Sequence, residues 1–181
     1  MARKKLKVDL ACGQNLTPGF VGVDVWAGAD IVHDLLVFPF PFADRSVDEV
    51  VCNHFVEHIP MRETALGQDL FCAFMDEVWR VMRPGARATF TYPHLHSDRA
   101  FQDPTHRRFI PWPTWLYFNA QWRKDNGLDH YQLACDFEII SVEACGIAAD
   151  VATRHHEVAT LMQDRQWNVV ADTKVVIERK K

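Results

Sequence analysis

The chain lacks the features that mark several large classes of protein. No apolar run approaches the length of a membrane span, and the N-terminus has no apolar signal core. Lysine and arginine number 20 against 24 aspartate and glutamate residues, a net charge of −4, so there is no overall basic surface for nucleic acid. Basic residues do cluster at both ends, Arg3–Lys7 and Arg179–Lys181, where we expect solvated tails. These absences predict a cytoplasmic protein without membrane contacts.

The spacing of the cysteines matches no common metal or redox motif. The five cysteines form no C-x-x-C pair, and their number is odd. They are Cys12, Cys52, Cys72, Cys135 and Cys145. We expect buried free thiols in a reducing compartment, and no bound metal.

Repeats, low-complexity tracts and linkers are also missing. The 181 residues are 48% hydrophobic and 12% aromatic, which is enough to build one apolar core. We therefore expect a single domain over residues 1–181.

The dinucleotide fingerprint G-x-G-x-x-G is absent as well. One glycine, Gly13, follows the first predicted strand, and it precedes Asp24 by eleven positions (24 − 13). Thr17-Pro18-Gly19 predicts a turn between them. No room is left for an ordinary crossover helix, so a pyrophosphate bound at a helix N-terminus is not supported.

What the N-terminal stretch does contain is half of a nucleotide pocket. An apolar run, Leu6–Leu10, contains Asp9 and is followed by small residues, which allow a ligand to approach the backbone closely. A second apolar run ends in Asp24, where a carboxylate at a strand tip could accept hydrogen bonds from a ribose diol.

The segment Asp9–Asn15, followed by Gly22–Asp24, resembles the S-adenosylmethionine site of class I methyltransferases. In that family the first strand ends in an acidic residue and a glycine-rich turn, and the second ends in the ribose-binding acid. This turn keeps the middle glycine of the usual three, Gly13. The resemblance implies an α/β, Rossmann-like three-layer sandwich with a mostly parallel sheet, an antiparallel C-terminal strand and some crossover helices missing.

Hydrophobic periodicity predicts the remaining elements. The expected strands are Lys7–Ala11, Phe20–Val25, Asp30–His33, Val47–Asn53, Ala86–Tyr92, Phe137–Ala144 and Asn168–Arg179. A long helix is expected over Met61–Met82, with Leu66, Leu70, Phe74, Val78 and Val81 on its apolar side, and shorter ones over Pro113–Trp122 and His155–Gln166. Part of one sheet face would lack a helix, and the apolar loop Leu35–Phe42 or a second subunit could cover it, so a homodimer is one possibility.

The resemblance also implies a set of cofactor-binding residues at successive strand ends. They are Asp9, Ala11, Cys12, Gly13, Asn15, Asp24, Val25, Asp34, Leu35, Asn53 and His54, with S-adenosyl-L-methionine as the cofactor. Asp34 and Leu35 would meet the adenine, and Asn53 and His54 would lie near the methyl group. The alternative for Asp34 is an aspartate that initiates a turn.

Three histidines are the catalytic candidates: His54, His94 and His106. Imidazole titrates near neutral pH, so each could act as a general base. The segment Asp103–Phe109 resembles one found in helix-poor methyltransferases, and it would line the acceptor pocket. Tyr92 is a further base candidate, and Arg107 or Arg108 could hold an anionic acceptor. The alternative is a structural loop, with Asp103 as a cap and His106 bonded to backbone.

Two other patterns leave alternatives open. His54, Glu57 and His58 form H-x-x-E-H, the inverted zinc-peptidase motif, but Ile59-Pro60 interrupts the helix that this motif needs. His94, His96 and His106 match no standard metal spacing. The aromatic cluster of Trp112, Trp115, Tyr117, Phe118 and Trp122 is typical of a core, with an acceptor pocket as the alternative.

These patterns predict an S-adenosylmethionine-dependent methyltransferase that works by in-line displacement. The methyl acceptor is not identified, and we expect a small molecule rather than nucleic acid. A general base is required only if the acceptor must lose a proton. The alternatives are a non-catalytic cofactor- or protein-binding module of the same fold and, less favoured, a zinc hydrolase that uses His54, Glu57 and His58.

Overall fold

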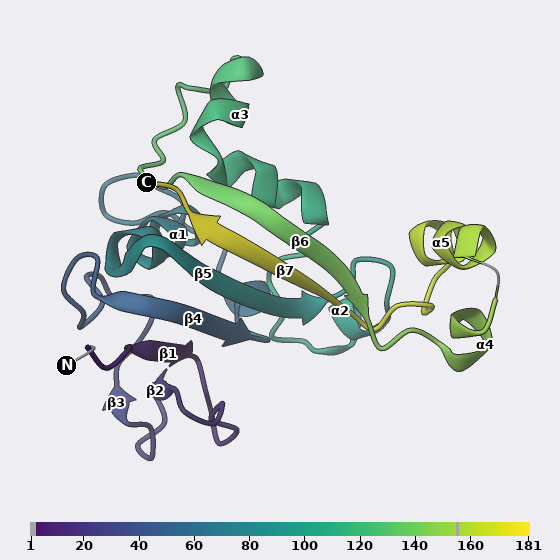
Figure 1. Cartoon of the computed structure of the whole chain (residues 1–181), viewed down its shortest axis with the longest axis horizontal. Helices are drawn as coiled ribbons and strands as arrows, with labels where there is room; N and C mark the ends of the chain where they lie inside the picture. The colour runs from purple at the N-terminus through teal and green to yellow at the C-terminus, as the bar shows by residue number, and fades with distance from the viewer. Residues whose placement is uncertain (1–2, 155) are drawn as a thin grey trace.

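The computed structural model describes residues 3–154 and 156–181. Within them the chain forms a seven-stranded sheet of order β3-β2-β1-β4-β5-β7-β6 (Figure 1). The strands are β1 Lys7–Leu10, β2 Val21–Asp24, β3 Ile31–Val32, β4 Val47–Asn53, β5 Met82–Pro93, β6 Phe137–Cys145 and β7 Asp172–Arg179. Strands β1 to β5 are parallel, and β7 is antiparallel to β5 and β6. The predicted mostly parallel sheet with an antiparallel C-terminal strand is confirmed.

Helices are few and mostly short. They are α1 Leu70–Val81, α2 Arg99–Gln102, α3 Ala120–Asp125, α4 Ala149–Ala152 and α5 His156–Arg165, with 3₁₀ segments η1 Val56–His58 and η2 Trp112–Phe118. The connections 11–20, 25–30 and 33–46, which join the first four strands, contain no helix. This confirms that crossover helices are missing. None of the helices in the described ranges is long and apolar enough to cross a membrane.

The sheet has no helical layer on the face toward the viewer in Figure 1, where β4, β5, β7 and β6 lie uncovered. On β7 the burial alternates, with Thr173, Val175, Ile177 and Arg179 buried and the residues between them partly exposed. The partly exposed side chains form cross-strand ion pairs, including Arg87 with Glu178 and Lys174 with Glu143. Cross-strand ion pairs therefore line part of this uncovered face.

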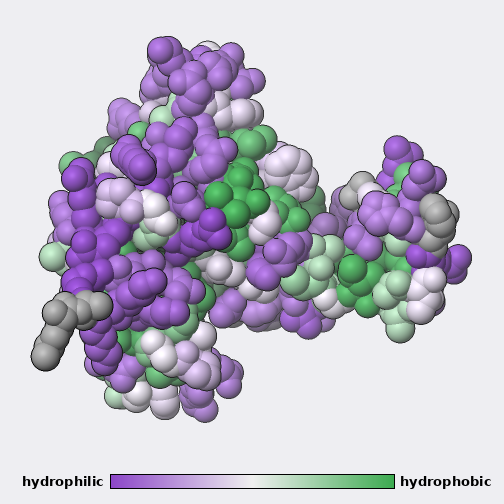
Figure 2. Space-filling model, in the orientation of Figure 1, coloured by the Kyte–Doolittle hydropathy of each residue, from purple (hydrophilic) through white to green (hydrophobic). Residues whose placement is uncertain are grey.

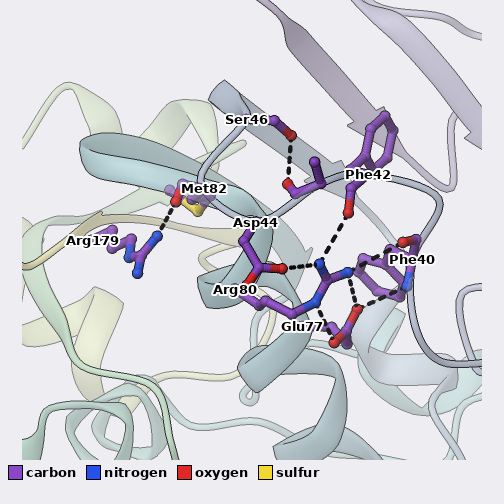
Figure 3. Close-up of polar contacts among 9 residues, drawn as sticks. Phe40, Phe42, Asp44, Ser46, Glu77, Arg80, Met82 and Arg179 are labelled. Carbon is purple, nitrogen blue, oxygen red and sulfur yellow. Dashed lines mark hydrogen bonds and ion pairs between the residues drawn. The ribbon is translucent and has the colours of Figure 1, made fainter.

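The apolar loop Leu35–Phe42 enters the core beside α1. Leu35 and Phe40 are 3% and 2% exposed, and the Phe40 ring packs against Phe74 of α1 with centroids 5.8 Å apart. Figure 3 shows how Arg80 of α1 holds the loop by donating to the carbonyl oxygens of Phe40 and Phe42. The loop thus takes the packing role of a crossover helix, and the homodimer stays a prediction.

The long helix predicted over Met61–Met82 is wrong in its first half, because α1 begins only at Leu70. Asp69 is the N-cap, and its carboxylate accepts hydrogen bonds from the backbone N–H groups of Phe71 and Cys72. Before it, Gly67 has φ +79°, which interrupts a helix. Leu66, expected in the core, is 91% exposed.

Other boundaries differ by smaller amounts. Strand β5 starts at Met82 rather than Ala86, because the chain leaves α1 directly into the strand and pairs with Val47. The helix predicted over Pro113–Trp122 is split into η2 and α3 at Asn119, which caps α3. The strand predicted over Asn168–Arg179 begins at Asp172. His155, the predicted start of the last helix, lies outside the described residues.

The C-terminal basic tail was predicted to be solvated, and for Arg179 this is wrong. Arg179 is 3% exposed, donates to the carbonyl oxygen of Met82 (Figure 3) and lies over the Trp79 ring at 4.1 Å. Burial lowers the pKa of this guanidinium below its usual value. Stacking on the Trp79 ring compensates part of the hydration that the Arg179 guanidinium loses on burial. This explains how a charged residue can be buried at the end of β7.

Candidate functional site

The turn after β1 is folded against the end of β2. Ala11 and Gly13 have positive φ angles of 59° and 49°. The N–H of Ala11 donates to the carbonyl of Val23 (2.8 Å), and the N–H of Gly13 donates to Asp24 Oδ2 (2.9 Å). No atom lies within 4 Å of the place where a Cβ on Gly13 would stand, so this point of the turn faces open space.

Asp24 is the acidic residue at the tip of β2. Besides the bond from Gly13, its Oδ1 accepts the N–H of Trp26 at 2.8 Å. Each carboxylate oxygen has two lone pairs, so each can still accept a hydroxyl. Asp24 therefore has the position and the acceptor capacity that a ribose-binding acid needs.

Asp9 and Cys12 support this turn from inside. Asp9 is 2% exposed, and its Oδ2 accepts the N–H of Thr17 at 2.8 Å, which closes the connection to β2. Cys12 is 8% exposed, and burial raises the pKa of its thiol. Asn15 is exposed on the outer side of the turn. Of these three predicted cofactor residues, only Asn15 presents its side chain to solvent.

Gly22 is required for the close contact between this turn and β2. We expect Gly22→Ala to lower the free energy of unfolding by about 2 kcal/mol, because its Cβ would overpack the site. That Cβ would stand 2.7 Å from Cys12 Sγ and 3.0 Å from Leu16 Cδ1. Urea denaturation followed by circular dichroism measures the loss. The double variant Cys12→Ala/Gly22→Ala should recover most of it, and an equal loss in both variants would contradict this packing.

Apolar side chains are exposed near the ends of β2 and β3. Val25 and Val32 are 67% and 60% exposed. Asp34 is exposed, and its Oδ1 accepts the N–H of Leu36 at 2.8 Å, as a turn-initiating aspartate does. The side chain of Leu35 is in the core, so only its backbone could meet an adenine. This edge therefore offers apolar surface beside two carboxylates.

The end of β4 bends sharply at His54, which has φ +51°. Its N–H donates to the carbonyl of Thr91 at 2.8 Å, which holds the bend against β5. Its ring Nδ1 lies 3.4 Å from Glu57 Oε1, and the Glu57 carboxylate raises the pKa of His54. Asn53 and His54 are exposed, so both predicted residues are accessible at this edge.

The H-x-x-E-H segment does not form a helix that could present His54 and His58 together. Only Val56–His58 is helical, as one 3₁₀ turn, and Ile59 leaves it in an extended conformation. His54 precedes this turn in a left-handed conformation. The ligand arrangement of the zinc-peptidase motif is therefore not formed.

The segment after β5 is a structural loop that also brings residues to the site. Arg108 donates to the carbonyls of Ile59 and Pro60 and to Asp69, and Arg107 donates to the carbonyl of Pro104. Arg108 is therefore committed to the protein, whereas Arg107 is exposed and its role toward an anionic acceptor stays a prediction. The loop alternative explains Asp103 as well, since its Oδ1 accepts the N–H of Thr105.

The two remaining catalytic candidates lie in different places. His106 Nδ1 bonds the carbonyl of Ala100 at 2.9 Å, while His94 Nδ1 contacts Thr173 Oγ1 at 2.9 Å. Tyr92 is 1% exposed, and burial raises the pKa of its hydroxyl, so it stays protonated near neutral pH. His54 and His106 share one cavity, and His94 lines another.

The smaller cavity, about 210 Å³, opens between the ends of β4 and β5. It is lined by His54, Glu57, His58, Pro93, Arg99, Gln102, Asp103 and His106. The larger, about 630 Å³, lies between His94–His96, the start of η2 and strand β6, with Gln163 of α5 at its side. Figure 2 shows hydrophobic residues on this face between β6 and the α4–α5 segment. Neither cavity contains Gly13 or Asp24, whose surroundings form an exposed edge of the sheet.

Residues of β6 and β7 in the larger cavity were missed by sequence reasoning. Val142, Glu143, Ala144 and Thr173 line it. They reach it because β7 inserts between β5 and β6, a long-range pairing that leaves no local signal in the sequence.

Comparisons with known proteins agree on the fold. No family model matches the chain, and no curated protein matches it. Solved structures do match. A SAM-dependent methyltransferase from Archaeoglobus fulgidus is 15% identical, with a TM-score of 0.65 over 97% of this chain and 86% of that one. A SAM-dependent methyltransferase from Methanosarcina mazei is 14% identical, with a TM-score of 0.55 over 99% and 94%.

A third match is the complex between the Haloferax volcanii Trm112 methyltransferase activator and a methyltransferase. It is 14% identical, with a TM-score of 0.57 over 98% of this chain and 83% of the other. At these identities the likeness establishes the fold, which is that of class I SAM-dependent methyltransferases.

Proposed function

We propose that the chain is an S-adenosylmethionine-dependent methyltransferase. The observation that carries the proposal is the hydrogen bond from the Gly13 N–H to Asp24 Oδ2, which unites the turn after β1 with the acidic tip of β2. In open α/β sheets, ligands bind outside the carboxyl ends of the strands, where this pair lies. The matched solved structures with the same fold support the proposal.

The exposed edge fits an adenosine group. Asp24 would accept the ribose hydroxyls, and Gly13 would let the ligand approach the backbone, because nothing occupies the space beside it. Val25 and Val32 offer apolar surface to a base. Asp34 would accept the amino group of adenine. These roles need only groups that the described edge already presents.

Methyl transfer requires few catalytic groups from the protein. The bound cofactor supplies an electrophilic methyl group, and the residues must align an acceptor lone pair with it. Such alignment can contribute about 7–11 kcal/mol to catalysis. His54, held at the end of β4 by its bond to Thr91, is the general base that we propose for acceptors that lose a proton. The Glu57 carboxylate raises the pKa of His54, which makes its imidazole a stronger base.

The acceptor is proposed to be a small molecule bound in the larger cavity. Its volume, about 630 Å³, suits a drug-sized ligand. Its walls are mostly apolar, with polar groups on His94, His96, Glu143, Gln163 and Thr173. His94 of the larger cavity directly follows Pro93 of the smaller cavity, so the two cavities share neighbouring lining residues. An apolar acceptor with one or two polar groups would match this lining.

Calorimetric titration of S-adenosylhomocysteine tests the cofactor assignment. Wild type should bind it, and Asp24→Ala should weaken binding at least about 30-fold, because two ribose hydrogen bonds to a charged group are lost. Asp30→Ala is the matched control. Asp30 also accepts a backbone N–H of β2, that of Gly22 at 2.9 Å, so its loss perturbs the same strand.

Thermal melting of each variant checks that the fold is intact. Absence of measurable heat with wild type, at concentrations well above those that saturate common methyltransferases, would refute the cofactor assignment. Equal weakening by Asp24→Ala and Asp30→Ala would assign the effect to the strand rather than to a ribose contact, and would refute the role of Asp24.

A further inference from the structure

A buried carboxylate in the smaller cavity has no hydrogen-bond partner. Glu57 of η1 is 2% exposed, and neither of its carboxylate oxygens is hydrogen-bonded within the described residues. A buried, uncompensated carboxylate costs several kcal/mol, so native proteins pair it or place it on a cation. The neighbouring cationic groups fill this role only in part. Arg99 pairs with Asp172, and Arg107 and Arg108 bond other groups. His54 Nδ1 lies 3.4 Å from Glu57 Oε1, which is an ion pair only while His54 is protonated.

Two histidines stand beside this carboxylate. His58 and His106 have ring centroids 4.7 Å apart in an edge-to-face arrangement. In the described part of the chain, Glu57, His58 and His106 form a group whose ligand atoms all lie within 4.8 Å of one another. His106 comes from a distant segment, which backbone bonds from Arg107 and Arg108 to the Glu57 carbonyl hold against η1.

Hydrogen bonds set the tautomer of His106. Its Nδ1 lies 2.9 Å from the carbonyl oxygen of Ala100, and a carbonyl can only accept. Nδ1 therefore carries the proton, and in the neutral ring Nε2 holds a free lone pair. The ring is only 7% exposed, so this lone pair is directed within the protein.

The tautomer of His58 is set by a longer chain of bonds. Thr105 Oγ1 donates to Asp103 Oδ1 at 2.6 Å, because an ionised carboxylate can only accept. The hydroxyl proton is thus used, so at 3.0 Å Thr105 Oγ1 must accept from His58 Nδ1. His58 Nε2 is then also left with a lone pair.

We propose that Glu57, His58 and His106 form a binding site for a divalent first-row transition metal such as Zn²⁺. Two neutral imidazole nitrogens and one carboxylate are a donor set that such ions favour, and both imidazoles are oriented through Nδ1 in the way that metal-ligating histidines are. Metal–ligand distances of about 2.0–2.2 Å require the donor atoms to move together by side-chain rotation. This site differs from the H-x-x-E-H motif, because His54 is not a ligand.

Three protein ligands leave at least one coordination position open. The cavity of about 210 Å³ has room for the ion and several waters. On the proposed methyltransferase function, that position would bind an oxygen donor of an acceptor that extends from the larger cavity to His54. Metal binding and cofactor binding are measured separately, so a failure to bind metal would refute the metal site and not the proposed methyltransferase function.

The test uses the full chain, stripped with a chelator and titrated with Zn²⁺ and with Co²⁺. We expect one ion per chain, visible-region absorption for bound Co²⁺, and a rise in melting temperature on binding. His106→Ala should weaken binding at least about 100-fold, and Thr105→Val, which removes the bond that orients His58, about 10-fold or more. His96→Ala is the matched control, since it removes another histidine of the same loop and should bind as wild type does.

The variant Glu57→Gln distinguishes two roles for Glu57, as a metal ligand or as a carboxylate that stabilises the fold. In metal-free protein, at a pH at which His54 is neutral, this variant should melt at the same temperature as wild type or higher, because a buried carboxylate that makes no hydrogen bond is removed. Its melting temperature should then fail to rise with Zn²⁺. Three results would overturn the proposal: no stoichiometric uptake by wild type, unchanged binding in His106→Ala, or destabilisation of the metal-free protein by Glu57→Gln. Loss of binding in His54→Ala would overturn the ligand set.

Discussion

Replacing Arg80 with alanine is expected to lower the free energy of unfolding by about 3 kcal/mol. The Arg80 side chain is 25% exposed, and it makes five hydrogen bonds. Two go to the carbonyls of Phe40 and Phe42, and three go to the carboxylates of Glu77 and Asp44 (Figure 3). Without them the loop Leu35–Phe42 loses its anchor to α1, and the carboxylate of Glu77 loses its counter-charge.

The expected change in melting temperature is about 6–12 °C for a chain of this size. Differential scanning calorimetry or urea denaturation measures it. Arg87→Ala is the matched control. Arg87 is 57% exposed and makes one ion pair, with Glu178, so its loss should cost no more than about 1 kcal/mol. Similar losses in both variants would mean that the loop is not held by Arg80.

The hydrogen bonds of Arg80 show why the strands could be predicted from the sequence, whereas the contacts that hold the loop Leu35–Phe42 could not. The central strands were predictable because they bury apolar residues of their own, as Val47–Asn53 does with its bounds unchanged. The way the loop replaces a helix depends on Arg80 reaching carbonyls about forty positions away, and no local pattern encodes such contacts. The start of α1 was misplaced because Leu66 has the spacing of a helical residue, although Asp69 directly before Leu70 is itself a recognisable N-cap.

The two parts of the candidate site also differ in how far they could be predicted from the sequence. Gly13 and Asp24 were predictable together, because each lies at the end of a short strand and they are eleven positions apart. Glu57 and His58 meet His106 across nearly fifty positions, and only the packing of the 103–108 segment on η1 brings them together. In the sequence, Glu57 and His58 suggested a partnership with His54 instead, since these three are close along the chain.

Replacing Trp115 with alanine is expected to be the most destabilising of these changes, at about 4 kcal/mol. The side chain is 1% exposed, and its ring lies against Phe90 and Tyr92 of β5 and Phe71 of α1, with centroids 4.7, 5.8 and 6.1 Å away. Its Nε1–H donates to the Tyr92 hydroxyl at 2.8 Å. The variant would leave a large cavity between the sheet and α1, and a buried hydroxyl without its donor.

Trp112 is the matched control, because it lies one turn earlier in the same 3₁₀ segment but is 48% exposed. Trp112→Ala should change the free energy of unfolding by no more than about 0.5 kcal/mol, since surface substitutions seldom do more. Trp112 also lines the larger cavity, so its loss should reduce binding of an acceptor there without unfolding the protein. The aromatic cluster would then have two functions, with Trp115 in the core and Trp112 at the pocket. Equal destabilisation by the two substitutions would contradict that division and place both rings in the core.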